Sequence, residues 1–407
     1  MNNSVQRKAS KHEDGVDLIS NLPDPLLLLI LSGLQSTEEQ IRTSILSRRW
    51  RYLWTLVPSL DLKPLAKLQN SKFKEFVYWV LLNRSVDLYC FRLSGWDSYR
   101  TSTVERWIHA TVMKNVKQLD LSFGPKEKYI EDMMIPHCLM TCTSLEVLRL
   151  SCRHRVILPR ISGFPALRVL KLENVELFDN DLVKYFFLES CPLLEDLTLY
   201  ECVVDKLDLL CVSCPNLKKL TLLNWCKYYL CSSLKLSCPK LVYLDLKGEV
   251  ASSYIFECLY SLKEAVLYPE CDAIFNKLFH EFSHLESLAT NLDFLPEIDD
   301  AHDLALQNLK TLELHSSIDE FTAERLIQAL EYCPELESLS LTFENVISCD
   351  PMEHPKLDDA ATRRILPPDV KWLEFFEFKR ENPKLVLKYE NGYGWMDLVA
   401  RWGKQAS

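Results

Sequence analysis

A pattern of three leucine-type residues, L-x-x-L-x-L, recurs eleven times along this chain of 407 residues. Successive copies begin 21 to 29 residues apart, a spacing too regular for chance. A short strand repeated at this period indicates a solenoid, in which every coil adds one strand to a parallel sheet and stacking buries a continuous leucine core. The copies begin at Leu88, Val116, Leu145, Leu167, Leu194, Leu217, Leu241, Leu262, Leu285, Leu309 and Leu336.

The period and the leucine spacing resemble those of leucine-rich repeats. The resemblance implies an α/β fold with a curved parallel sheet on the concave side. Residues 322–330 have the pattern of a helical return segment, whereas residues 203–210 and 230–236 alternate and favour extended returns. We therefore expect a convex side of mixed helical and extended segments.

Side chains alternate across a strand, so the residues between the buried leucines of each copy face solvent on the concave side. Basic residues at these positions predict a partly basic ridge with aromatic anchors, interrupted by Asp196 and Asp245. An ordinary solvated surface of mixed charge is the alternative. The candidate contacts for a target protein are Arg149, Lys171, Tyr200, Lys219, Tyr243, Lys247 and His315.

Before the repeats, the segment from Leu22 to Leu31 contains six consecutive apolar residues. Asp24 followed by Pro25 predicts a helix start with Asp24 as the N-cap, and Gly33 predicts its end. A helix that is apolar on every side is normally buried all round, and six residues are too few to cross a membrane.

Two further short helices are expected directly after it. Ser36 and Glu39 form a capping-box pattern, and Trp50, Leu53 and Trp54 share one face of a third helix. Three helices in about forty residues cannot cover this much apolar surface. Another chain or the next domain must therefore cover it.

The segment from Asp17 to Trp54 resembles an F-box, in its Leu-Pro start, its apolar helix and its Ser-Arg-Arg-Trp-Arg end. This resemblance covers residues 17–62 and implies binding to a Skp1-type adaptor and, through it, to the cullin and RING subunits of an SCF ubiquitin ligase. A purely intramolecular helical cap on the next domain is the alternative. The residues that match the motif are Leu22, Pro23, Leu26, Ile30, Leu31, Leu34, Ile41, Leu46, Trp50, Leu53 and Trp54.

The whole chain divides into six predicted segments. They are a disordered tail (1–15), the F-box (16–62), a junction helix (63–84), the repeats (85–349), a linker (350–365) and a C-terminal cap (366–407). The last segment is similar to the FBD segment of plant F-box proteins. A strand is expected at Leu385–Leu387, and the aromatic content of the segment suggests that it closes the last repeat.

Composition limits the function. A formal net charge of −10 argues against a general nucleic-acid binder, and no apolar run approaches the length of a membrane span.

The polar N-terminus is not a secretory signal, so the 15 cysteines should be reduced thiols in the nucleus or cytoplasm. Four of them, at positions 191, 214, 238 and 333, precede proline in the repeat pattern and read as small buried hydrophobes. Cys211 with Cys214, Cys231 and Cys238 leaves a zinc site as a weaker alternative.

One catalytic motif occurs, since His280, Glu281 and His284 satisfy H-E-x-x-H. The repeat alignment instead places His284 in the turn before a strand, because a helix through both histidines would remove Leu285 from the core. Phosphate-binding and nucleophile motifs are absent from the sequence. We therefore expect no catalysis by this chain, no metal and no cofactor.

Together these features predict a non-catalytic substrate receptor of an SCF-type E3 ubiquitin ligase. The F-box would hold the adaptor and the concave face would hold an unidentified target protein, promoting its ubiquitination and proteasomal degradation. Two alternatives remain: a repeat scaffold outside ubiquitination, and a co-receptor whose concave face binds a small ligand that completes the target site.

Overall fold

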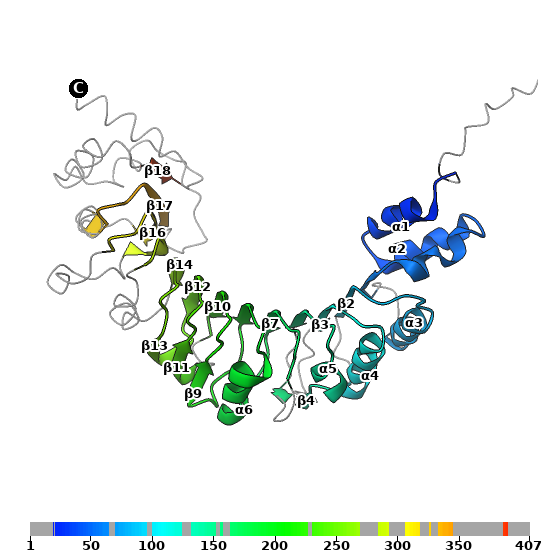
Figure 1. The fold of residues 1–407 in the computed structure, drawn as a ribbon, viewed down its shortest axis with the longest axis horizontal. Helices are drawn as coiled ribbons and strands as arrows, with labels where there is room; N and C mark the ends of the chain where they lie inside the picture. The colour runs from blue at the N-terminus through cyan, green and yellow to red at the C-terminus, as the bar shows by residue number, and fades with distance from the viewer. Residues whose placement is uncertain are drawn as a thin grey trace, which may run out of the picture.

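A computed structural model shows the chain as an arc of stacked coils with a small helical module at its N-terminal end (Figure 1). The structure describes residues 19, 21–64, 70–95, 100–123, 132–151, 155–157, 163–226, 230–268, 284–292, 306–317, 325–326, 333–344 and 386–389. The predicted tail 1–15 and linker 350–365 lie outside these residues. None of the helices in these ranges has the length and apolarity to cross a membrane.

One parallel sheet of thirteen strands in the described residues lines the inner side of the arc (Figure 1). It confirms the predicted α/β solenoid, and it contains one strand from each of the eleven predicted repeats. The strands, in spatial order, are β1 Ser59–Leu62, β2 Cys90–Gly95, β3 Gln118–Phe123, β5 Val147–Ser151, β7 Val169–Glu173, β8 Asp196–Tyr200, β10 Lys219–Asn224, β12 Tyr243–Gly248, β14 Glu264–Tyr268, β15 Ser287–Asn291, β16 Thr311–Ser317, β17 Ser338–Glu344 and β18 Val386–Tyr389.

The sheet is longer than the repeat pattern by one strand at each end. β1 comes from the end of the F-box segment and pairs with β2, so the helical module and the solenoid share a sheet. β18 pairs with β17, which confirms the strand expected at Leu385–Leu387. The rest of the predicted C-terminal cap lies outside the described residues.

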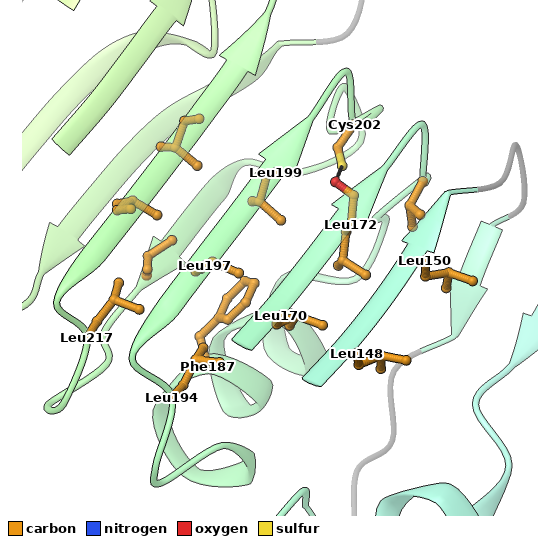
Figure 2. Close-up of a cluster of buried hydrophobic side chains, with 14 of the residues drawn as sticks. Leu148, Leu150, Leu170, Leu172, Phe187, Leu194, Leu197, Leu199, Cys202 and Leu217 are labelled. Atoms are coloured by element: carbon orange, nitrogen blue, oxygen red, sulfur yellow. Dashed lines mark hydrogen bonds between the residues drawn. The ribbon is translucent and has the colours of Figure 1, made fainter. Parts of the chain in front are cut away.

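The core of the solenoid is a stack of leucines in register. Leu170 pairs with Leu148 on one side and with Leu197 on the other, and the same register continues along the sheet. Figure 2 shows these leucines pointing to one side of the sheet, with Phe187 beneath them. Full burial of one such side chain contributes ~2 kcal/mol, so the leucine stack is the main favourable contribution to folding of the sheet.

The convex side changes character along the arc. Its first part carries the helices α3 Asn70–Leu82, α4 Thr101–Val112, α5 His137–Met140, α6 Asn180–Tyr185 and η3 Phe186–Ser190, and a two-stranded sheet of β4 Asp132–Met134 and β6 Arg155–Ile157. The next part is a parallel sheet of β9 Leu209–Val212, β11 Cys231–Ser237 and β13 Ala251–Glu257. It confirms the extended return expected at 230–236, whereas in 203–210 only residues 209 and 210 belong to a strand and residues 205 and 206 form a turn. Of the expected helix 322–330, only residues 325 and 326 are described, and both are helical.

The proline-linked cysteines are buried core residues, as predicted. Cys214 Sγ donates to the carbonyl oxygen of Phe187 at 3.0 Å, and Cys238 Sγ donates to that of Val212 at 3.5 Å. Burial raises the pKa of the Cys238 thiol to about 11. The described residues contain no group of three or more metal-ligating side chains that could hold a metal ion, so nothing in them supports the zinc alternative.

A ladder of charged residues runs along the edge where the strands begin. The backbone N–H of each member donates to the carbonyl oxygen of the member before it, so the side chains of successive coils lie next to one another. Lysine or arginine alternates with glutamate, apart from one valine in the middle. The members of this charge ladder are Lys117, Glu146, Arg168, Glu195, Lys218, Val242, Lys263, Glu286, Lys310 and Glu337.

Candidate functional site

The helical module consists of α1 Asp24–Ser32, α2 Thr37–Arg42, η1 Thr43–Ile45 and η2 Trp50–Leu56. The capping box is present at α2, where Ser36 Oγ accepts a hydrogen bond from the backbone N–H of Glu39 at 3.3 Å. The Glu39 carboxylate accepts from the N–H of Gln35, one residue earlier than the pattern predicts. The first bond satisfies an N–H group in the first turn of α2, and the second ties the residue before the cap to the helix.

The expectation that Asp24 caps α1 is wrong. Pro23 occupies the cap position, and Asp24 is already in the first turn. Its carboxylate instead accepts from Arg49 Nε at 2.8 Å and from Arg49 Nη2 at 2.6 Å, and the same Nη2 donates to the carbonyl oxygen of Leu22. This bidentate contact ties the start of α1 to the turn before η2, because a guanidinium matches both groups at once.

The module has a small core of its own. Leu27, Leu31, Trp50, Leu53 and Val57 pack together and are almost fully buried. Trp54 belongs to the solenoid core instead and stacks on Trp79 of α3 with 5.1 Å between the ring centres. The module therefore has a core of its own, and it also packs against the repeats through Trp54.

The eleven residues matched to the adaptor surface fall into three groups. Pro23, Leu26, Ile30 and Leu46 are exposed, and Leu22, Leu34 and Ile41 are partly buried. Leu31, Trp50, Leu53 and Trp54 are buried inside this chain, so they hold the module together and offer no side-chain surface to a partner. The chain by itself buries only Leu27 and Leu31 of the six apolar residues of α1, in line with the expectation that the module cannot cover this helix alone.

The structure adds two exposed residues that the sequence did not single out as contacts. Leu29 is 69% exposed and lies on the same face of α1 as Leu26 and Ile30, at i, i+3 and i+4. Ile45, at the end of η1, is 88% exposed, and its neighbour Leu46 is 63% exposed. We call Leu26, Leu29, Ile30, Ile45 and Leu46 the apolar surface of the module. Isolated surface leucines are ordinary, whereas five exposed apolar side chains in one small module are unusual for a surface that only water contacts.

A buried arginine fixes the module to the solenoid. Arg84 Nη1 donates to the carbonyl oxygen of Trp54 at 2.8 Å, and Nη2 donates to that of Val57. Burial lowers the pKa of Arg84 to about 10. Lys114 Nζ in turn donates to the carbonyl oxygen of Arg84 at 3.2 Å, which extends the connection to the next coil.

On the concave face, the predicted target residues do not form one basic ridge. The strand register places Arg149 and Lys171 side by side in the middle row of outward residues. Lys219 and Tyr243 are paired in the first row, whereas Lys247 pairs with Tyr268 in the third row, together with Tyr200 and His315. The sequence gives each residue's place in its repeat, but a continuous ridge also requires the same place in adjacent repeats.

Two of these lysines lie over tyrosine rings. Lys219 Nζ is 4.8 Å from the ring centre of Tyr243, and Lys247 Nζ is 5.9 Å from that of Tyr268. Tyr268 also packs edge-to-face against His315, with 5.1 Å between ring centres. Tyr268 was not among the predicted contacts, although it stands at the position of its repeat that corresponds to Lys247.

The H-E-x-x-H motif is only partly described. His284 lies in the turn before β15, and Leu285 is buried in the solenoid core, which confirms the repeat alignment at these two positions. His280 and Glu281 lie outside the described residues. Described residues near His284 line a polar groove that includes the ladder residues Lys263, Glu286 and Lys310. Within the groove these charged side chains lie beside one another, and Lys263 pairs with Glu286 at 2.7 Å.

Comparison with known proteins agrees with this architecture. Residues 19–62 match the F-box domain, and residues 104–231 match the family described as "FBD-associated F-box protein At5g56370, LRR repeats". The chain is 30% identical over 292 residues to F-box/LRR-repeat protein At3g26922 of Arabidopsis thaliana, an alignment that covers 70% of this chain and 94% of that protein.

Two further Arabidopsis thaliana relatives are similar. FBD-associated F-box protein At1g66310 is 33% identical over 272 residues, covering 63% of this chain. F-box/FBD/LRR-repeat protein At2g26030 is 26% identical over 364 residues, covering 82% of this chain and 80% of that protein. The chain spans 58% of the length of At1g66310, so the two differ outside the matched region.

Proposed function

Because this chain belongs to the plant F-box/LRR-repeat family, we propose that it is the substrate-recognition subunit of an SCF-type E3 ubiquitin ligase. Its F-box would bind a Skp1-type adaptor, and its repeats would bind the target protein. The chemistry would take place on other subunits. The receptor's own contribution would be proximity, since it raises the concentration of target lysines near the ubiquitin carrier.

One observation carries the adaptor assignment. The F-box module is folded around its own small core, yet it leaves Leu29 and Ile45 largely exposed. Leaving such side chains in water gains nothing for folding, because each loses about 1.5–3 kcal/mol relative to burial. A partner that covers this apolar surface regains that free energy, and an apolar centre with a polar rim is typical of a stable interface.

Co-expression with a Skp1-type adaptor from a plant tests the assignment. We expect Leu29→Arg and Ile45→Arg to reduce adaptor co-purification at least tenfold, because each places a charge in the buried interface. Both side chains are exposed in the free chain, so the melting temperature should stay unchanged. The matched control is Leu82→Arg, at an equally apolar side chain that is 82% exposed at the end of α3, outside the F-box.

If both F-box variants co-purify as much adaptor as the wild-type chain does, the proposal is contradicted. A repeat scaffold outside ubiquitination is separated by a second measurement, because only an SCF receptor brings cullin down with the adaptor. A ligand-dependent co-receptor would instead require an added small molecule for target binding. The nucleus or cytoplasm is the compartment we propose, since reduced, buried cysteines such as Cys214 and Cys238 suit either one.

A further inference from the structure

The outward residues of strands β8 to β16 form a surface that combines aromatic rings with carboxylates. We call it the aromatic–acidic patch. Its position follows from the register, in which Lys219 of β10 lies between Asp196 of β8 and Tyr243 of β12, and Tyr243 lies next to Glu264 of β14. The patch consists of Asp196, Tyr200, Lys219, Tyr243, Asp245, Lys247, Glu264, Tyr268, Glu313 and His315.

Negative charge exceeds positive charge in the patch. Four carboxylates face two lysine ammonium groups, which leaves two negative charges in excess when His315 is neutral. Lys247 pairs with Asp245 at 3.3 Å, and Glu313 lies 3.3 Å from His315. Asp196 and Glu264 form no ion pair with a described residue. Glu264 is exposed, and Asp196 is half-buried, with its Oδ1 buried and without a hydrogen-bond partner among the described residues. These two carboxylates can therefore receive a positive group from a partner, Glu264 more readily than Asp196.

The two central tyrosines report the same negative field. Burial raises the pKa of Tyr243, and the neighbouring Asp245 and Glu264 raise it further. Burial, followed by Glu313 and Asp245, holds the pKa of Tyr268 well above its usual range. Burial is the main reason that both hydroxyl groups resist ionisation, and the neighbouring carboxylates add to it. Carboxylates placed around partly exposed rings also attract a cation.

The rings themselves bind ammonium groups. Lys219 and Lys247 each lie over a tyrosine ring, a geometry in which the ring face attracts positive charge. Tyr268 and His315 meet across the intervening strand β15, whose outward residues Ala289 and Asn291 are small or of modest size. Tyr200 is 40% exposed at the other end of the patch. Such aromatic side chains act as anchors at protein interfaces because they lose little conformational entropy on binding.

The first half of the concave face differs in charge balance. On strands β1 to β7, Arg92, Arg149 and Lys171 face Asp61, Asp120 and Glu173, so three positive charges meet three negative ones. Arg92 and Asp120 lie 3.9 Å apart. The outward residues of strands β1 to β7 therefore carry no net charge that could attract a charged partner. The aromatic–acidic patch is the part of the described concave face with an excess of one charge.

We propose that the aromatic–acidic patch recognises a target segment that carries arginine or lysine side chains. The positive groups of the segment would pair with Glu264, Glu313 and Asp196, while its apolar parts would pack on Tyr200 and Tyr268. This inference rests on the proposed function, because it names the class of target that the concave face receives. An acidic or phosphorylated segment bound at Arg149 and Lys171 is the competing outcome.

The test uses the full chain immobilised by its C-terminus and a displayed library of random twelve-residue peptides as the probe. We expect the enriched peptides to carry a net positive charge, and their binding to weaken as salt increases. The double variant Glu264→Lys/Glu313→Lys should weaken binding of an enriched peptide at least tenfold. Both carboxylates are solvent-accessible, so the variant should fold. The matched control is Glu189→Lys/Asp205→Lys, which makes the same change of charge at exposed residues on the return segments.

Enrichment of acidic peptides, equal binding by the patch variant, or no enrichment at all would overturn the inference. Adaptor co-purification is measured on the same preparation of chain. Loss of adaptor binding with basic peptides still enriched would defeat the proposed function alone, and the reverse result would defeat only the patch.

Discussion

Arg84 lies two residues beyond the end of α3, and its Nη1 donates a hydrogen bond at 2.8 Å to the backbone carbonyl oxygen of Trp54 in the last helical turn of the F-box. The same guanidinium also reaches Val57. A single buried side chain thus satisfies two carbonyl groups at the point where the F-box passes into the first strand. This contact and the shared sheet join the F-box to the repeats.

Removing this guanidinium should destabilise the junction. We expect Arg84→Ala to lower the free energy of unfolding by about 1–3 kcal/mol, because the buried Val57 carbonyl loses its donor and the Trp54 carbonyl keeps only the backbone N–H of Val57 at 3.3 Å. Urea denaturation measures the effect, and Arg106→Ala at an exposed position of α4 is the control. A loss below ~0.5 kcal/mol would show that water replaces the arginine at no cost.

The charge ladder has one gap, and filling it should stabilise the solenoid. Val242 lies between Lys218 and Lys263, joined to both coils by backbone hydrogen bonds. Val242→Glu would place a carboxylate between two ammonium groups, with an expected gain of about 0.5–1 kcal/mol that fades in high salt. Val242→Lys should destabilise by a similar amount. Thermal unfolding at low and high salt distinguishes the three proteins, and equal melting temperatures would show that the ladder contributes nothing.

The leucine stack predicts large effects of truncation at its centre. Leu220 and Leu244 are adjacent in register and fully buried. Each change to Ala should cost about 2–5 kcal/mol, the usual range for a cavity in a well-packed core. Leu223→Ala, on the outward side of the same strand, should cost far less. Equal losses at Leu220 and Leu223 in denaturation experiments would contradict the inward and outward assignment.

The buried thiols predict loss of stability at alkaline pH. Burial raises the pKa of Cys231 and Cys238 to about 11 and that of Cys202 to about 12. The unfolded chain therefore loses these protons first, from about pH 9 upward, and the free energy of unfolding falls as pH rises through this range. We expect Cys202→Ala/Cys238→Ala to be less stable at pH 7 but to lose less stability between pH 8 and pH 10. A parallel decline in both proteins would exclude the thiols as the cause.

The solenoid was predictable because its signal is periodic. Leu170, Leu197 and Leu220 occupy the same place in successive repeats, so their burial follows from the pattern alone. The strand β1 was missed, since Leu60 and Leu62 show only the end of the pattern, and the F-box match drew them into another domain. Because β1 joins the F-box to the repeats, its residues show neither the full repeat pattern nor a pattern typical of the F-box helices.

The candidate sites were predictable only in part. A run of six apolar residues contains no polar residue to mark its exposed side, so the sequence could not show that Leu27 and Leu31 face inward while Leu29 faces water. On the concave face, Lys219 and Tyr243 were both predicted, whereas Tyr268, the ring beneath Lys247, was not. Contacts such as that between Tyr268 and His315 depend on the curvature of the sheet, which no single repeat determines.

Hydrogen–deuterium exchange of the purified chain, with and without a Skp1-type adaptor, tests the central claim most directly. We predict that adding the adaptor slows exchange in α1 and η1, which carry most of the apolar surface of the module, and leaves the leucine strands β8 to β12 unchanged. Unchanged exchange in Asp24–Ser32 and Thr43–Ile45 at saturating adaptor would contradict the account.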